Sequence, residues 1–293
     1  MKAKKKILVL GATGMLGHKV IQVGLKKGLD VYGTVRGSYR SILNSAGIPS
    51  DRILSNLAID HKDTKKTLER LAEIIWHDTL AVVNCIGITV QKIGPPEQAI
   101  MCNALFPHQL AEICSKKSVK LIHISTDCVF SGKRGNYTDC DIPDAEDLYG
   151  RTKIMGEVHG LEHLTIRSSM VGREIAEEKA GLLEWFLAQK GEVNGFTRVF
   201  WSGVTSNYFA EVIFELLEKY PEAKGLMQLA SEPIDKYTLL KIFQKYYRKD
   251  DVKINKQDKT KSDKSMINNS LGLKFIVPHH EEMVRVMAAE ASP

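Results

Sequence analysis

A glycine-rich turn between an apolar strand and an amphipathic helix is the feature that most constrains how this chain can fold. The run Lys6–Leu10 reads as a short buried strand, because Ile, Leu and Val follow one another without a polar break. After the turn, apolar residues recur at the spacing of one helix face. The turn itself consists of Gly11, Ala12, Thr13, Gly14, Met15, Leu16 and Gly17. Strand, glycine turn and helix in this order predict the first unit of a parallel α/β sheet.

Each glycine of this turn has its own physical task. Gly11 permits a tight bend, Gly14 lets the backbone approach a pyrophosphate, and Gly17 allows the helix to pack closely on the strand. The phosphates would bind at the helix N-terminus, where free N–H groups and the helix dipole favour anions. We therefore predict that the turn binds a nicotinamide dinucleotide through Gly11, Thr13, Gly14, Met15, Leu16 and Gly17.

The second strand, over residues 30–36, bears on the choice of coenzyme. An NAD site usually places an acidic residue near the end of this strand to hold the ribose hydroxyls. Here the strand ends in Thr34, Val35 and Arg36, with Arg40 close behind. A guanidinium suits a 2′-phosphate, so NADP(H) is preferred and NAD(H) stays possible. The alternative is that Arg36 simply faces solvent.

Strands and helices continue to alternate beyond this point. A segment that ends at residues 57–60 reads as a short third strand with its loop, and Asp60 is a candidate for hydrogen-bonding an adenine amino group. A helix over 64–76 and a strand over 79–83 follow. The small residues at the end of this strand would pass under the cofactor: Asn84, Cys85, Ile86 and Gly87.

The next helix and strand carry polar residues in places that suggest a site. Asn103 stands amid apolar neighbours on a helix predicted over 97–116, so we expect it to be buried and hydrogen-bonded. A β-branched strand over 119–124 ends in Ser125 and Thr126, which places hydroxyl groups at the carboxyl edge of the sheet. The regular alternation predicts a parallel, right-handed, doubly wound sheet.

Tyr149 and Lys153 stand four residues apart at the start of a predicted helix. On a helix, both side chains lie on one face, one turn apart. A free tyrosine has a pKa of about 10, and a nearby ammonium favours the ionised phenol. The pair could therefore exchange a proton near neutral pH. The alternative is an exposed helix start with an ordinary Tyr and Lys.

The alternation stops after a strand that ends at Arg167, which predicts two domains. Residues 1–167 would form an NAD(P)-binding Rossmann domain, and residues 168–293 a smaller α+β substrate-binding lobe. Parts of about 196–220 would return to the Rossmann sheet, and a late strand is expected over 226–229. Helices are predicted over 181–190, 207–219, 235–248 and 281–289.

Composition narrows the class of protein. The chain has 293 residues, is 43% hydrophobic and 26% charged, and has no apolar run near the roughly 20 residues that a membrane helix needs. The apolar run after the basic start is too short for a signal-peptide core, so we expect a cytoplasmic protein. Nine Lys or Arg face four Asp over 241–264, and a solvated lysine-rich face is favoured there over a nucleic-acid patch.

The cysteines disfavour a disulfide framework and a zinc knuckle, because their number is odd and no Cys-x-x-Cys pair occurs. No metal site is predicted. Cys85 and Cys128 fall near the proposed site and are interpreted as small buried residues rather than nucleophiles. We expect a monomer or homodimer without nucleic-acid or membrane partners.

Three motifs together resemble a known family. They are the glycine turn, Ser125-Thr126-Asp127-x-Val129-Phe130, and Tyr149-Gly150-x-Thr152-Lys153-x-x-Gly156-Glu157. In combination they are similar to those of the extended short-chain dehydrogenases/reductases, and most to the dTDP-4-dehydrorhamnose reductase group, over nearly the full length. The resemblance implies a Rossmann domain with a small substrate domain. It also implies NAD(P)H-dependent reduction of the 4-keto group of a nucleotide-linked 6-deoxyhexose.

Residue roles follow from the same resemblance. Tyr149 would protonate the developing alkoxide, and Lys153 would lower the phenol pKa and bind the nicotinamide ribose. Thr126 would hydrogen-bond the substrate carbonyl. Asn103 matches an asparagine on the helix beside the site and would order the site or relay protons. The nucleotide sugar is the implied substrate.

Two other functions stay open from the sequence. An epimerase or dehydratase of the same superfamily would hold NAD tightly and regenerate it in each cycle. The dehydratases commonly have an acid pair after the catalytic Thr, whereas this chain has Asp127 and then Cys128. A non-catalytic NADP-binding regulatory subunit is the other alternative, and the intact Thr126, Tyr149 and Lys153 argue against it.

Overall fold

The larger body of the molecule is built around a seven-stranded sheet in which every pair of neighbours is parallel. The computed structural model describes residues 5–37, 40–55, 57–59, 63–160, 162–268, 272–273 and 275–290. In spatial order the strands are β11 (Gly225–Gln228), β6 (Leu164–Arg167), β5 (Lys120–Ile124), β4 (Thr79–Asn84), β1 (Lys6–Leu10), β2 (Asp30–Thr34) and β3 (Ile53–Leu54). The predicted parallel, doubly wound sheet is confirmed.

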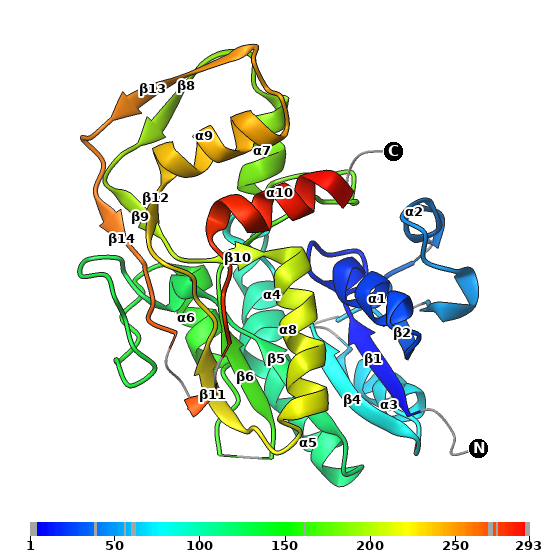
Figure 1. Ribbon diagram of the computed structural model, residues 1–293. Coiled ribbons are helices and arrows are strands. Elements are labelled where there is room, and N and C mark those ends of the chain that lie inside the picture. Colours follow the sequence, from blue (N-terminus) through cyan, green and yellow to red (C-terminus); the bar gives the residue numbers. More distant parts are fainter. Residues whose placement is uncertain are drawn as a thin grey trace.

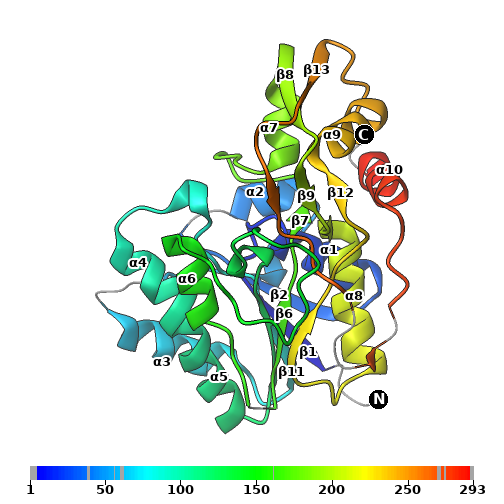
Figure 2. The ribbon, with the colours of Figure 1, turned by 90° about the vertical axis from the view of Figure 1, so that its left-hand side faces the viewer.

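Helices cover both faces of the sheet, so the central strands bury side chains on both of their faces. Figure 2 shows the sheet between two helical layers. Along β1, Ile7 and Val9 join one buried cluster while Leu8 and Leu10 join the other, as the two-residue period of a strand requires. The first layer contains α1 (Gly17–Lys26) and α8 (Ser206–Lys219), and the second contains α3 (Thr64–Ile74), α5 (Phe106–Lys116) and α6 (Leu148–Met155).

One predicted helix is interrupted. The segment expected to be helical over 97–116 consists of α4 (Pro96–Ile100), a π-helical turn η3 (Met101–Leu105) and α5. Pro107 has no N–H and cannot donate to the carbonyl of Asn103, so the regular ladder fails at this point. The N–H of Phe106 donates to the Met101 carbonyl five residues back, which accommodates one extra residue in the turn.

The remaining elements form a smaller lobe, drawn at the top of Figure 1. Its apolar core includes Phe186, Trp201, Phe243 and Met287. Its strands are β7 (Met170–Val171), β8 (Gly191–Phe196), β9 (Val199–Trp201), β10 (Val204–Thr205), β12 (Ile234–Asp235), β13 (Val252–Gln257) and β14 (Ser262–Asp263). Its helices are α7 (Leu182–Ala188), α9 (Lys236–Tyr246) and α10 (His280–Glu290).

The chain returns from the lobe to the larger body. The helix α8 packs against α1, and β11 adds to the edge of the sheet beside β6, so the late strand predicted over 226–229 is confirmed. Short elements complete the larger body: α2 (Arg40–Ser45), η1 (Ser50–Arg52), η2 (Val90–Lys92) and η4 (Asp127–Val129). No helix among the described residues is both long and apolar enough to cross a bilayer.

A buried ion pair joins the end of α6 to the end of β6. The Arg167 guanidinium donates to both oxygens of Glu157, at 2.7 Å each, and both side chains are at most 3% exposed. The Ser125 hydroxyl donates to the same carboxylate at 2.7 Å. The pair therefore connects α6, β6 and the segment after β5 behind the carboxyl edge of the sheet.

We predict that Glu157→Gln lowers the free energy of unfolding by about 3–5 kcal/mol, because it leaves the buried Arg167 charge without a counter-ion. Urea denaturation followed by circular dichroism measures the change. Glu162→Gln is the control, since Glu162 pairs with Lys224 at 2.7 Å on the surface, where the pair contributes little. Equal losses in the two variants would contradict the prediction.

Candidate active site

The carboxyl ends of four neighbouring strands open into one cavity of about 420 Å³. The strand order reverses between β1 and β4, and ligands of open α/β sheets bind at such a crevice. The segments after these strands line the cavity with residues 14–16, 85–87, 124–128 and 168–171. Tyr149 and Lys153 of α6 line it from the larger body, and Trp201 and Lys236 line it from the lobe.

The glycine turn lies at the β1 end of this cavity. Gly11 has a φ of +81°, and its N–H donates to the Thr34 hydroxyl at 3.3 Å. A Cβ on Gly17 would lie 2.2 Å from the Gly11 carbonyl oxygen, so only glycine lets α1 start this close to the turn. Of the six residues predicted to bind the dinucleotide, Gly14, Met15 and Leu16 line the cavity, whereas Gly11, Thr13 and Gly17 shape the turn.

Tyr149 and Lys153 lie one turn apart on α6, as predicted. Asp147 is the N-cap of this helix, and its carboxylate accepts the N–H of Gly150 at 2.9 Å. The Lys153 ammonium donates to the carbonyl of Ile124, the last residue of β5, at 2.8 Å. Burial lowers the pKa of Lys153 to about 8, and Glu157 acts in the opposite direction, so the amine is mostly protonated at pH 7.

The structure brings Thr126 and Tyr149 together and corrects one expectation about the phenol. Burial raises the pKa of Tyr149 above its ordinary value, the nearby Cys128 acts in the same direction, and a hydrogen bond with Thr126 lowers it. The sequence predicts a lowered pKa caused by Lys153. That prediction is wrong for this structure because desolvation of the phenolate outweighs the nearby hydrogen bond. Tyr149 is therefore a protonated donor at neutral pH.

Asn103 is fully buried but does not line the cavity. Its side-chain amide hydrogen-bonds both backbone groups of Ile88: it accepts the N–H at 2.8 Å and donates to the carbonyl at 2.9 Å. It also donates to the Thr152 hydroxyl on α6 at 3.3 Å. The π-helical turn thus orients Asn103 to join the segment after β4 to the helix that carries Tyr149.

Two residues predicted to contact the cofactor, Asn84 and Arg36, do not line the cavity. Asn84 is fully buried, where it hydrogen-bonds His123 at 3.1 Å and accepts the N–H of Ile86 at 3.1 Å, so it positions Ile86 at the cavity wall. Arg36 is exposed after the end of β2 and does not line the cavity. Asp60 lies outside the described residues.

Two cysteine thiols line the cavity. Cys85 follows β4 and Cys128 follows β5, and both are half-buried. Burial raises the pKa of each thiol to about 12. Both side chains are therefore neutral at physiological pH.

Several cavity residues are not singled out by any sequence motif. Ser168 and Ser169 directly follow β6. Because the carboxyl ends of parallel strands lie at one edge of the sheet, their position in the sequence would have been enough to predict them at the site. Trp201 and Lys236 come from the lobe, where no sequence pattern relates them to the sheet. Across the cavity wall, the Lys92 ammonium donates to the carbonyl of Glu178 at 3.0 Å, which connects the larger body to the lobe.

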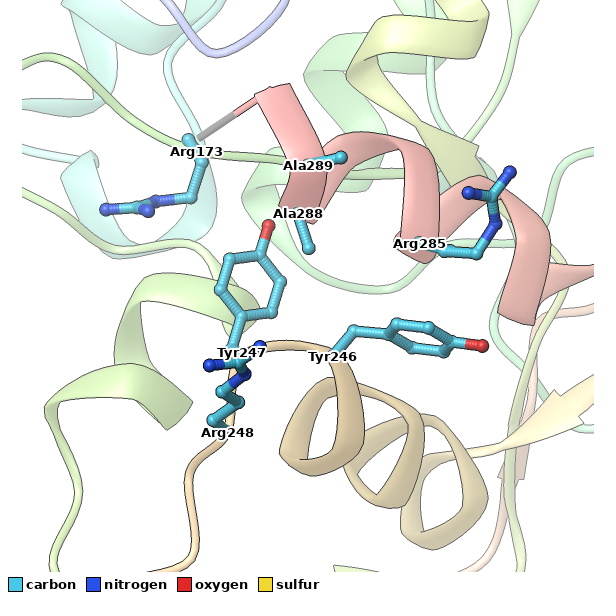
Figure 3. Close-up of a pocket in the computed structure, with 7 residues that line it drawn as sticks. All are labelled: Arg173, Tyr246, Tyr247, Arg248, Arg285, Ala288 and Ala289. Atoms are coloured by element: carbon cyan, nitrogen blue, oxygen red, sulfur yellow. The ribbon is translucent and has the colours of Figure 1, made fainter. Parts of the chain in front are cut away.

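A second cavity of about 450 Å³ lies on the lobe between the ends of α9 and α10 (Figure 3). Figure 3 shows the guanidinium groups of Arg173, Arg248 and Arg285 spread around it rather than converging. Arg173 pairs with Glu184 at 2.6 Å and Arg285 with Glu282 at 2.7 Å. Two of its three charges are thus already neutralised, and none of the predicted catalytic residues lines it.

Comparison with known proteins shows a family likeness over most of the chain. The sequence model of the family described as "RmlD substrate binding domain" matches residues 5–231. A probable low-salt glycan biosynthesis reductase of Haloferax volcanii is 34% identical over 152 residues, 51% of this chain and 46% of that protein. A dTDP-4-keto-6-deoxy-D-glucose reductase of Streptomyces niveus is 31% identical over 155 residues, 51% of this chain and 45% of that protein.

The chain spans about half the length of these curated relatives. Among solved structures, a dTDP-4-dehydrorhamnose reductase of Bacillus anthracis in complex with NADP superposes with a TM-score of 0.77. That comparison covers 98% of this chain and 99% of the other at 16% identity. At this identity the likeness establishes the fold.

We predict that Gly17→Ala weakens binding of NADPH about 5- to 150-fold, because overpacking of this kind costs about 1–3 kcal/mol and displaces the Gly11 carbonyl. Fluorescence titration with NADPH measures the affinity. Gly94→Ala is the matched control, since no heavy atom lies within 4 Å of a Cβ placed there. Unchanged NADPH affinity in Gly17→Ala would show that the turn is not the dinucleotide site.

Proposed function

Since the chain belongs to the RmlD substrate binding domain family, we propose that it is an NADPH-dependent reductase of nucleotide-linked sugars. Its reaction would be the reduction of the 4-keto group of a 6-deoxyhexose, as in the dTDP-4-dehydrorhamnose reductase group. The observation that carries this proposal is the grouping of Thr126, Tyr149 and Lys153 in one cavity that the glycine turn also lines. The name of the relative from Haloferax volcanii, a glycan biosynthesis reductase, supports the proposed role in making sugars for surface polysaccharides.

The residues at the β1 end of the cavity fit a dinucleotide. The first turn of α1 leaves N–H groups without intrahelical partners, and a pyrophosphate would bind there beside Gly14, Met15 and Leu16. Residues 85–87 would lie along the cofactor on the β4 side. NADP(H) is proposed over NAD(H) because Arg36 follows β2 and no acidic residue stands at the end of that strand. When bound, the nicotinamide supplies a hydride.

Reduction of a ketone places negative charge on its oxygen, and residues of this chain would stabilise that charge. The Tyr149 hydroxyl donates a proton to this oxygen, which suits a phenol that burial keeps protonated. Thr126 donates a second hydrogen bond to the same oxygen. The Lys153 ammonium, fixed on the Ile124 carbonyl, supplies positive charge nearby and binds the nicotinamide ribose. Asn103 positions this arrangement through Ile88 and Thr152.

Neutral cysteine at position 128 favours a reductase over a dehydratase. The dehydratases commonly have a second acid at the position of Cys128, and burial raises the pKa of this thiol to about 12, so it cannot replace a carboxyl group as an acid near pH 7. We also propose a cytoplasmic location and a monomer or homodimer, with no nucleic-acid or membrane partner. A turnover screen of 4-keto-6-deoxy dTDP- and UDP-sugars with NADPH and NADH tests the function directly.

We predict that Tyr149→Phe lowers kcat at least about 100-fold, because one positioned proton donor contributes about 10²- to 10⁴-fold. Oxidation of NADPH, followed by its absorbance with the best keto sugar, measures the rate. Tyr246→Phe is the control, since its hydroxyl donates to Glu281 on the lobe, 3.0 Å away. Full turnover by Tyr149→Phe would remove the proposed role.

We predict that kcat/KM of the wild type falls as pH rises through about 8, because the Lys153 ammonium is present below its lowered pKa and lost above it. Burial also lowers the pKa of Lys236 to about 8, so the profile is repeated in Lys236→Arg, whose guanidinium stays charged. A decline that persists in this variant belongs to Lys153. A profile that stays flat well above this pKa would contradict the assignment.

A further inference from the structure

A lysine from the lobe lines the same cavity as Thr126, Tyr149 and Lys153. Lys236 is the first residue of α9, and its ammonium lies over the Trp201 ring, 4.9 Å from the ring centroid. A cation at a helix N-terminus opposes the helix dipole, so stability of α9 does not explain this lysine. The N-cap is already provided by Asp235, whose carboxylate accepts the N–H of Thr238 at 2.9 Å.

The Trp201 ring beneath this ammonium is fixed by several contacts. The Trp201 indole N–H donates to the Ser169 hydroxyl at 2.8 Å, and the His280 ring packs on the indole with centroids 5.7 Å apart. A Cβ on Gly203 would lie 2.2 Å from the Trp201 ring, so the ring occupies the space that only glycine leaves. Pairing of β12 with β9 sets Ile234 opposite Trp201 and thereby places Lys236 next to it.

The contacts of this ammonium within the described part of the chain include no ion pair with a carboxylate. Among the residues that the structure describes, none forms an ion pair with Lys236, and its ammonium lies instead against the Trp201 ring. Burial lowers the pKa of this ammonium, and Asp127, in the turn after Thr126, is the carboxylate whose charge acts on it and raises its pKa. Even partial burial of an ammonium that lacks an ion-pair partner costs hydration, which a fold tolerates where a ligand supplies the partner charge.

We propose that Lys236 is a substrate-binding residue whose ammonium, held on Trp201, pairs with an anionic oxygen of the nucleotide sugar. This inference rests on the proposed function, since it deepens the substrate class of that site. The proposed 6-deoxyhexose substrate presents such an oxygen from its diphosphate, whereas a uronic-acid substrate would also present one from its sugar carboxylate. Both sources have the same chemistry at Lys236, and a comparison of ligands with and without the sugar carboxylate distinguishes them.

The test measures affinity and does not require turnover. Isothermal calorimetry with NADP⁺ present compares UDP, dTDP, UDP-glucose and UDP-glucuronic acid on the wild type, Lys236→Met and Lys236→Arg. A charged hydrogen bond contributes about 1.5–3 kcal/mol, so Lys236→Met should weaken binding about 10- to 100-fold. Lys236→Arg keeps the charge and should lose less. Lys241→Met is the control, because Lys241 is exposed on the same helix and bonds Gln244.

The pattern of losses identifies the source of the oxygen. Equal weakening of all four ligands assigns it to the diphosphate, and weakening of UDP-glucuronic acid alone assigns it to the sugar carboxylate. Affinities in Lys236→Met within about twofold of the wild type would overturn the inference, as would equal losses in Lys241→Met. Wild type that binds none of the four ligands would overturn it as well.

Two further measurements distinguish a lysine that binds substrate from one that only supports Trp201. Lys236→Met removes a half-buried ammonium that has no ion-pair partner among the described residues, so its melting temperature should not fall, whereas loss of a supporting lysine would lower it. In steady-state assays the KM for the nucleotide sugar should rise while the KM for NADPH stays unchanged. Wild type that binds these ligands but reduces no keto sugar would defeat the proposed reductase and leave the role of Lys236 standing.

Discussion

The hydrogen bond from the Lys153 ammonium to the Ile124 carbonyl is the contact on which the geometry of the cavity depends. It ties α6 to the last residue of β5, and the Thr126 hydroxyl follows two residues later. One helical turn before Lys153, Tyr149 is thereby placed beside that hydroxyl. The carboxylate of Glu157, one turn after Lys153, holds Ser125 and Arg167 behind it. Three residues at four-residue spacing on one chain segment thus order the whole edge of the sheet.

Much of the larger body is predictable from local patterns. The glycine turn, the apolar strands and the spacing of Tyr149 and Lys153 are signals within short windows, and parallel topology follows from their order. The expectation for Asn103 is confirmed as to burial, because an amide amid apolar residues needs partners. Its actual partner, the Ile88 backbone, depends on the π-helical turn that Pro107 causes, and a periodic pattern predicts a regular helix there.

The parts that escape prediction arise from contacts between distant segments. Trp201 and Lys236 reach the cavity only because β9 pairs with β12, a two-residue match that no sequence pattern reveals. The direction of the Tyr149 pKa shift depends on how deeply the phenol is buried, and spacing along a helix carries no information on depth. Arg36 is a candidate only from its place after a strand, and the structure leaves it exposed and away from the cavity wall.

The extra residue in η3 changes the direction in which the side chains of α5 point. Each residue rotates an α-helix by about 100°. Without the extra residue of η3, the side chains of Leu110 and Cys114 would therefore be rotated by about 100° relative to Ala99. Those two side chains pack in the apolar cluster beneath β4 and β5. Deleting one residue ahead of Pro107 would leave a regular helix. That helix would keep either the packing of Leu110 and Cys114 or the hydrogen bonds of Asn103 to Ile88, because a regular helix cannot orient both sets of side chains correctly.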